Sequence, residues 1–82
     1  MPYTVSYTQE AADQILTLPI KVQRQIKTKV ERLSAGFTGN IKKLNATDNI
    51  YRLRSGDFRI LFQISESSIL ILLIGDRKDI YG

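Results

Sequence analysis

The most informative stretch of the chain is residues 50–64, which read IYRLRSGDFRILFQI. Strand-forming residues alternate on both sides of Ser55-Gly56-Asp57, a run that is typical of a turn. The pattern predicts two antiparallel strands joined by a short connection. On one side of the alternation stand Arg52, Arg54 and Arg59, where a small sheet would normally offer apolar or neutral polar groups. The presence of these guanidinium groups therefore needs an explanation.

A third strand is expected at about residues 68–74, after the short connection Ser65-Glu66-Ser67. Connections this short permit only an antiparallel meander, in which the arginines of neighbouring strands lie side by side. Like charges in that arrangement repel one another unless an anion binds between them. The run from Ile69 to Ile74 is apolar on both faces of its strand, which predicts a position inside the sheet and not at its edge.

The amino-terminal half of the chain predicts a strand followed by two helices. Tyr3 to Tyr7 alternates as a strand, and apolar residues recur at helical spacing over residues 9–18 and again over 20–34. Residues 36–49 show no period and read as a loop, which leaves room for a short strand around Ile41 to Leu44.

We therefore expect a single domain of the α+β class over residues 1–82. Its predicted architecture is a helical hairpin packed on one face of a small, mainly antiparallel four-stranded sheet, in the order β-α-α-β-β-β. One face of the sheet takes the helices, and the opposite face keeps its arginines.

The composition excludes several kinds of active site. Cysteine and histidine are both absent, which rules out disulfides, thiolate metal sites, cysteine nucleophiles and a histidine general base. The eight acidic residues are scattered and do not form the carboxylate cluster of a two-metal nuclease, so we expect no metal and no cofactor. Twelve lysines and arginines give a net charge of +4 and a pI near 9.6, which favours a polyanionic partner.

The sequence predicts a cytoplasmic location. It contains no apolar run of the roughly 18 residues that a membrane span requires. The first ten residues, MPYTVSYTQE, lack the basic start and apolar centre of a signal peptide. We therefore expect no membrane partner.

Three motifs resemble those of the RelE/ParE superfamily of bacterial and archaeal toxins: KKL at residues 42–44, YRLRSGDFRILFQI at 51–64 and GDRKDIY at 75–81. Together with the predicted order of elements, the resemblance extends over essentially the whole chain. It implies a small toxin that a cognate antitoxin protein keeps inactive. In the RelE-like branch the toxin enters the ribosomal A site and cuts the mRNA there without a metal, whereas the ParE-like branch inhibits DNA gyrase.

The motif residues are similar to those of the RNA-cleaving, RelE-like branch. By this resemblance the catalytic set consists of Arg52, Arg54, Arg59, Arg77 and Tyr81. Some cleaving members carry lysines where this chain has Arg52 and Arg54, and many relatives carry GHR where it has Gly75-Asp76-Arg77. The resemblance implies a metal-independent, ribosome-dependent mRNA endoribonuclease that inhibits translation. The alternatives are a ParE-like gyrase inhibitor without nuclease activity and a non-catalytic antitoxin-binding relative.

Cleavage of RNA through its 2′-hydroxyl needs a proton acceptor, a proton donor and positive charge around the phosphate. Arginine suits the last role, since its pKa above about 12 keeps it charged. Arg59 and Arg77 would clamp the scissile phosphate, and Arg52 or Arg54 would lie beside the leaving group. Tyr81 is the expected base, because nearby cations lower the pKa of a phenol from about 10. Stacking on a nucleobase is the second role open to it.

Other polar residues have an ordinary interpretation beside a functional one. Asp76 could orient Arg77 or replace a histidine base, although a carboxylate in a surface turn is the commoner case. The candidates for RNA binding share a positive charge and a predicted surface position: Lys21, Arg24, Lys27, Lys42, Lys43 and Lys78. Each could instead be a solvated surface group. The expected partners are the cognate antitoxin, mRNA in the ribosomal A site and ribosomal RNA.

Overall fold

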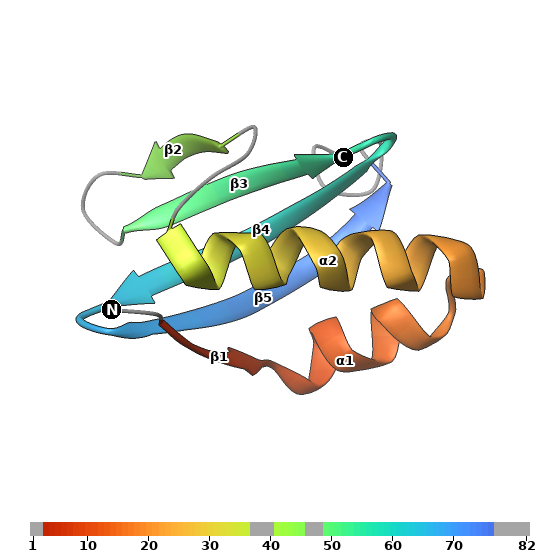
Figure 1. Ribbon diagram of the computed structural model, residues 1–82, viewed down its shortest axis with the longest axis horizontal. Coiled ribbons are helices and arrows are strands. Elements are labelled where there is room, and N and C mark those ends of the chain that lie inside the picture. Colours follow the sequence, from red (N-terminus) through yellow and green to blue (C-terminus); the bar gives the residue numbers. More distant parts are fainter. Residues whose placement is uncertain (1–2, 37–40, 46–48, 77–82) are drawn as a thin grey trace.

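The computed structural model describes residues 3–36, 41–45 and 49–76. The elements follow one another along the chain as β1 (Thr4–Tyr7), α1 (Gln9–Leu16), α2 (Ile20–Gly36), β2 (Ile41–Asn45), β3 (Ile50–Ser55), β4 (Phe58–Ser65) and β5 (Ser68–Asp76) (Figure 1). No helix in this part of the chain is long and apolar enough to cross a membrane.

The strands form one mixed five-stranded sheet in the order β1-β5-β4-β3-β2. β2, β3, β4 and β5 pair in antiparallel fashion, whereas β1 runs parallel to β5. The prediction of four strands is wrong, because Ile41–Asn45 pairs with β3 and adds β2 at the edge of the sheet. This strand lies within a segment whose Gly, Asn and Thr content is typical of a loop, so its period is hidden. The predicted inner position of the apolar strand is confirmed, since β5 lies between β1 and β4.

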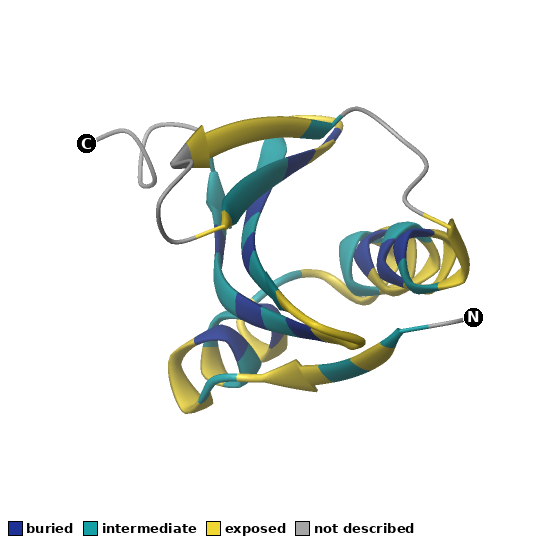
Figure 2. Cartoon of the chain, turned by 90° about the vertical axis from the view of Figure 1, so that its left-hand side faces the viewer, coloured by how far each residue is buried: buried dark blue, intermediate teal, exposed yellow. Residues whose placement is uncertain are grey.

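Most of the core lies between α2 and one face of the sheet, and Ala11 and Ile15 of α1 also belong to it. Figure 2 shows α2 on one side of the curved strands. On α2, Ile26, Val30 and Leu33 are buried at helical spacing. On the strands, the buried apolar residues are Leu53, Ile60, Phe62, Ile69, Ile71 and Ile74. Each such side chain stabilises the fold by about 1.5–3 kcal/mol. Because alternate residues of a strand point to opposite faces, the arginines next to Leu53 and Ile60 point away from α2.

α1 lies along the edge of β5, beyond the end of β1 (Figure 1). Thr8 connects β1 to α1. Its backbone N–H donates to the carbonyl of Ile71 at 3.0 Å, and its hydroxyl accepts a hydrogen bond from the N–H of Ala11 at 3.1 Å. The prediction placed both helices on one face of the sheet. α2 lies there, whereas α1 lies at the edge, because the parallel pairing of β1 brings the chain to that edge before the helix begins.

β5 contains a β-bulge at Leu72. Leu61 of β4 pairs with Leu73 of β5. The next residue of β4, Phe62, pairs with Ile71, so that Leu72 is an extra residue in β5. Because of this extra residue, the residues of β5 after Leu72 point to the opposite face from the one that they would occupy in an uninterrupted strand.

Candidate nucleic-acid interface

A row of cations crosses three strands on the sheet face that points away from α2. The register pairs Lys42 of β2 with Arg52 of β3, and it pairs Arg54 of β3 with Arg59 of β4. Arg52 and Arg54 are two residues apart on one strand and therefore share a face. We call these four residues the cation strip. The predicted side-by-side placement of arginines from neighbouring strands is observed for Arg54 and Arg59.

The cation strip sets like charges against each other in two successive register pairs. Directly opposite residues of an antiparallel pair have Cβ atoms about 4.5–5.5 Å apart. Like charges at that spacing destabilise strand pairing, by a few tenths to about 1 kcal/mol for each pair. An anion bound between them would relieve the repulsion. The strip therefore gathers positive charge on one face of the sheet, where a phosphate group could bind.

The arginines of the cation strip differ in exposure. Arg54 is exposed and Arg52 is half-buried, whereas Arg59 is only 6% exposed. The Nε atom of Arg52 and the Nε and Nη1 atoms of Arg59 are buried. The expectation of an open arginine face is thus wrong for Arg59, because Arg59 is paired on both sides, with Arg54 of β3 and Gly75 of β5. The described pairing of β2 with β3 reaches only Leu53, which leaves Arg54 more exposed. Burial restricts the orientation of this guanidinium group and places its charge in a medium of low dielectric constant.

The end of β5 lies beside the cation strip. Gly75 pairs with Arg59, and Asp76 pairs with Phe58. Glycine has no side chain, so β5 adds no bulk next to Arg59 on that face. Asp76 follows Gly75 and points to the other face of the sheet, where it is half-buried. Asp57 is exposed in the turn after β3, in agreement with a role as a turn residue.

Three predicted site residues lie outside the described part of the chain: Arg77, Lys78 and Tyr81. The predicted roles of Arg77 in phosphate binding, of Lys78 in RNA binding and of Tyr81 as base stay predictions. Within the described residues, the candidate site is therefore the cation strip with Gly75.

The two lysines of β2 have different surroundings. Both are exposed, and their alternation along the strand places them on opposite faces of the sheet. Lys42 belongs to the cation strip, whereas Lys43 extends its Nζ over the ring of Tyr51, 5.5 Å from the ring centroid. Tyr51 in turn stacks on Phe62 with the ring centroids 5.6 Å apart. Lys43 thus makes a cation–π contact with the core face and does not extend the strip.

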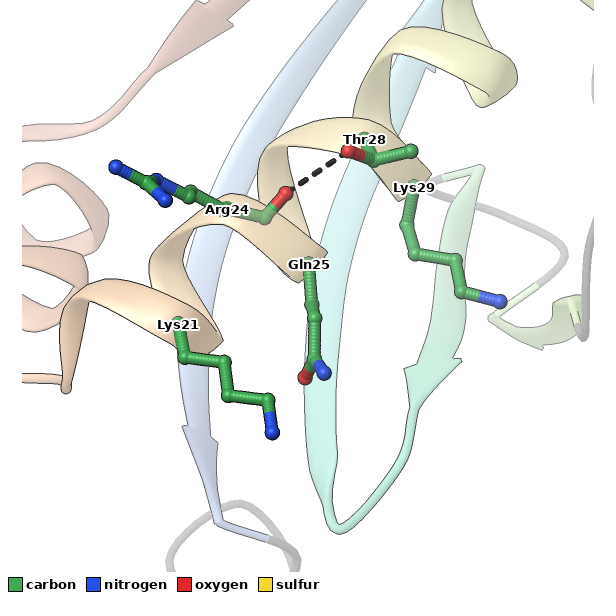
Figure 3. A pocket seen from close by; sticks show the side chains of 5 residues that line it. All are labelled: Lys21, Arg24, Gln25, Thr28 and Lys29. Carbon is green, nitrogen blue, oxygen red and sulfur yellow. Dashed lines mark hydrogen bonds between the residues drawn. The ribbon is translucent and has the colours of Figure 1, made fainter.

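The cations of α2 form a second basic feature. Lys21, Arg24, Gln25, Thr28 and Lys29 line a furrow of about 420 Å³ on the outer side of this helix. In Figure 3, Lys21, Gln25 and Lys29 point to one side of α2 and Arg24 to the other, while the Thr28 hydroxyl donates to the Arg24 carbonyl at 2.9 Å. We call these five residues the helix furrow. Its two exposed cations, Lys21 and Arg24, were both predicted to bind RNA.

Lys27, the third helix cation in the predicted RNA-binding set, lies apart from the helix furrow. It borders an apolar hollow of about 230 Å³ that is also lined by Tyr7, Ala12, Ile15 and Leu16. Burial raises the pKa of the Tyr7 phenol above its usual value, and the carboxylate of Glu31 adds to the rise. The sequence offered no signal for this hollow, because its residues come from β1 and both helices.

The cation strip and the helix furrow lie on opposite sides of the layer that α2 forms with the sheet. Ile26 and Val30 of α2 point into the same core as Leu53 and Ile60 of the sheet. The furrow residues lie on the side of the helix away from that core, and the strip lies on the far face of the sheet. One phosphate group therefore cannot contact both, whereas a large RNA that surrounds the domain can. Within the described residues, no group of three or more acidic side chains is arranged to hold a metal ion.

The sequence model of the family described as "ParE toxin of type II toxin-antitoxin system, parDE" matches residues 3–81. No curated protein is similar enough in sequence to match this chain.

Several solved structures share the fold. The archaeal RelE–RelB complex from Pyrococcus horikoshii is 24% identical, with a TM-score of 0.82 over 94% of this chain and 97% of the other. The toxin–antitoxin complex RelBE2 from Mycobacterium tuberculosis is 25% identical, with a TM-score of 0.80 over 94% of this chain and 100% of the other. A mutant of the E. coli toxin RelE in the free state is 20% identical, with a TM-score of 0.80 over 96% of this chain and 87% of the other.

Proposed function

The chain belongs to the ParE toxin family of type II toxin–antitoxin systems, and we propose that this toxin is a metal-independent, ribosome-dependent mRNA endoribonuclease that inhibits translation. The observation that carries the proposal is the placement of cations directly opposite each other on paired strands, Lys42 opposite Arg52 and Arg54 opposite Arg59. Such an arrangement concentrates positive charge at one place on the sheet, which favours binding of a phosphate. The absence of histidine and cysteine from the sequence leaves arginine, lysine, tyrosine and the carboxylates as the groups available for the chemistry.

The reaction joins the 2′-oxygen of a nucleotide to the adjacent phosphorus and breaks the bond from phosphorus to the 5′-oxygen. The 2′-hydroxyl loses a proton to a base, and the departing 5′-oxygen gains one. Arg59, with its restricted guanidinium group, would donate hydrogen bonds to the phosphate oxygens as their negative charge grows. Arg54, exposed and directly opposite, would bind the same phosphate from the neighbouring strand. By the family resemblance, Arg77 would act as a second phosphate clamp and Tyr81 as the base.

The helix furrow suits a different task, docking on ribosomal RNA. Lys21 and Arg24 are exposed and carry their charges on long side chains, and Gln25 adds an amide that can donate and accept. Contacts of this kind are insensitive to base sequence and weaken as salt rises. The cation strip would thus cleave the mRNA while the helix furrow holds the toxin on the ribosome.

An antitoxin protein is the expected partner of the inactive toxin. The P. horikoshii and M. tuberculosis structures of this fold are toxin–antitoxin complexes. To neutralise this domain, the antitoxin would cover positive charge with an acidic or apolar segment. Both proteins of the pair would reside in the cytoplasm.

A second candidate function is inhibition of DNA gyrase without RNA cleavage, which the match to a ParE family model favours. The basic surface would then bind gyrase or its DNA, and the arginines of the strip would have no chemical step to perform. The two candidates make opposite predictions for the message on a translating ribosome.

The experiment that separates them incubates the purified toxin with ribosomes programmed with a defined mRNA, in the presence and absence of EDTA. Cleavage at the A-site codon in both conditions supports the nuclease. An intact message, together with gyrase-dependent DNA breaks in cells whose growth has stopped, supports the gyrase inhibitor. An intact message in cells that grow normally indicates a non-catalytic relative that binds only the antitoxin.

A further inference from the structure

The bulge in β5 decides which residue lies opposite Arg59. With the bulge at Leu72, Arg59 pairs with Gly75. If β5 continued without it, in the register that β4 and β5 keep from Phe62 onward, Ile74 would face Arg59 instead. An isoleucine side chain would then occupy the space beside the guanidinium group. The bulge therefore keeps the cation strip free of apolar bulk at this point.

Two polar side chains of the first helical segment bind the backbone of β5 at the bulge. The Thr8 hydroxyl donates to the carbonyl of Leu72 at 2.9 Å. The side-chain oxygen Oε1 of Gln14 accepts a hydrogen bond from the backbone N–H of Ile74 at 2.7 Å. These contacts join residues 64 and 60 positions apart in the sequence. They hold the bulged residue and the second residue after it.

The contacts are needed because β1 is short. It pairs with β5 only from Ser68 to Ile71, so the edge of β5 beyond that point has no strand partner among the described residues. α1 takes the place of the missing strand, and Gln14 supplies the acceptor that a strand carbonyl would otherwise offer. The side chain of Ile74 is buried, and its backbone N–H would lose its acceptor if Gln14 were shortened.

We propose that Gln14 is a positioning residue, which fixes the β5 bulge through the Ile74 N–H and so holds Gly75 opposite Arg59. The expected effect on RNA cleavage rests on the proposed function, in which Arg59 binds the scissile phosphate. Gln14 touches no reacting group and acts only through β5. Thr8 shares the task, but it also caps α1, so substitution of Gln14 is the cleaner test.

The first measurement is backbone amide hydrogen exchange in the full chain, which does not depend on any activity. In Gln14→Ala the Ile74 amide is expected to exchange about tenfold faster, because a buried donor loses its acceptor. Gln14→Glu keeps an acceptor oxygen at the same reach and is expected to restore slow exchange. Gln14→Asn, whose acceptor is one methylene short of Ile74, is expected to behave like Gln14→Ala.

Gln9→Ala is the matched control. Gln9 lies on the same helix, where its Nε2 donates to Oδ1 of Asp13 at 2.9 Å on the exposed side. Its loss is expected to leave the Ile74 amide unchanged. Equal exchange of Ile74 in Gln14→Ala and Gln9→Ala overturns the proposal. An equal acceleration at the Val30 amide, in the middle of α2, also overturns it, since that result means a general loss of stability.

The second measurement is A-site cleavage by the same variants. Gln14→Ala is expected to lower kcat about tenfold or more and to leave KM unchanged, because the phosphate clamp is misplaced while the helix furrow is intact. Gln14→Glu is expected to restore kcat. Faster exchange at Ile74 with unchanged kcat overturns the positioning role. If the wild-type toxin cuts no message, the proposed function fails, and the exchange data still decide whether Gln14 holds the bulge.

Discussion

The cation strip and the helix furrow carry the same sign of charge in very different settings. The strip is built on strands, where register fixes each residue against its neighbour and Arg59 is almost completely buried. The furrow is built on the outer side of one helix, and its Lys21 and Arg24 are exposed. Planar guanidinium groups held by a sheet suit the orientation of one phosphate, whereas mobile charges on a helix suit contact with many. If the proposed function holds, the reaction and the docking on the ribosome would therefore use opposite sides of the domain.

The largest expected effect is the loss of Arg59. Arg59→Ala is expected to lower kcat for A-site cleavage by about 10²–10³-fold, the usual effect of removing a preorganised donor that stabilises growing negative charge. Arg59→Lys keeps a positive charge but not the planar fork, so we expect only partial recovery. Cleavage kinetics with programmed ribosomes provide the measurement, and thermal unfolding shows which variants are folded. A folded Arg59→Ala that cleaves at the wild-type rate would remove the strip from the mechanism.

A smaller effect is expected in the helix furrow. Lys21→Ala combined with Arg24→Ala should weaken binding to ribosomes about tenfold at physiological salt and leave kcat unchanged. The dependence of log affinity on log salt should become shallower by about 1.5, since two phosphate contacts are lost. Lys27→Ala is the matched control, because Lys27 lies on the same helix but outside the furrow. A similar loss of binding in the control would mean that overall charge, and not the furrow, holds the toxin on the ribosome.

Substitutions in two turns outside the cation strip and the helix furrow test whether stability alone can explain the effects on cleavage. Glu66, in the turn between β4 and β5, has a φ of 52°, which is costly for a residue with a side chain. Glu66→Gly is expected to relieve that strain and to raise the free energy of unfolding by about 0.5–1 kcal/mol, measured by urea denaturation. Gly56→Ala, in the turn before β4 at a φ of 60°, should lower it by a similar amount. Cleavage that rises and falls with these two variants would mean that stability alone explains the effects in the strip.

The smallest expected effect is on the pH dependence of the free energy of unfolding, through the phenol of Tyr7. Because burial, aided by Glu31, raises the pKa of this phenol above 10.0, the folded protein holds the proton more tightly than the unfolded chain does. This contribution to stability is therefore complete below about pH 10 and is lost as the pH rises further. Denaturation measured between about pH 9 and pH 11 should show a shallower decline for Tyr7→Phe than for the wild type. Parallel curves for the two proteins would contradict this assignment.

Much of the fold follows from local sequence patterns. Alternation in IYRLRSGDFRILFQI places the β3–β4 hairpin, and the two-sided apolar run of β5 places that strand inside the sheet. Helical spacing of Ile26, Val30 and Leu33 identifies the buried stripe of α2. Each of these elements buries enough apolar surface to leave a period in its own residues, which is why it could be predicted.

The features that escaped prediction depend on contacts between distant residues. The position of α1 and the bulge at Leu72 follow from hydrogen bonds made by Thr8 and Gln14, more than 50 residues earlier in the chain. The burial of Arg59 follows from its pairing on both sides, with Arg54 of β3 and with Gly75 of β5. The alternation around Arg59 in the sequence does not reveal these neighbours. The separation of Lys42 from Lys43 on opposite faces of β2 was not predicted either, because their segment was interpreted as a loop, and the contact of Lys43 with the ring of Tyr51 left no signal in the sequence.

The central claim is tested most directly at Arg54, because this strip residue is exposed and can be removed with little effect on folding. The measurement is the rate of mRNA cleavage on programmed ribosomes in the presence of EDTA, for the wild type and for Arg54→Ala at matched thermal stability. We expect the wild type to cut the A-site codon despite the chelator and Arg54→Ala to cut it about a hundredfold more slowly. Cleavage at equal rates by the two proteins, or an intact message with the wild type, would contradict it.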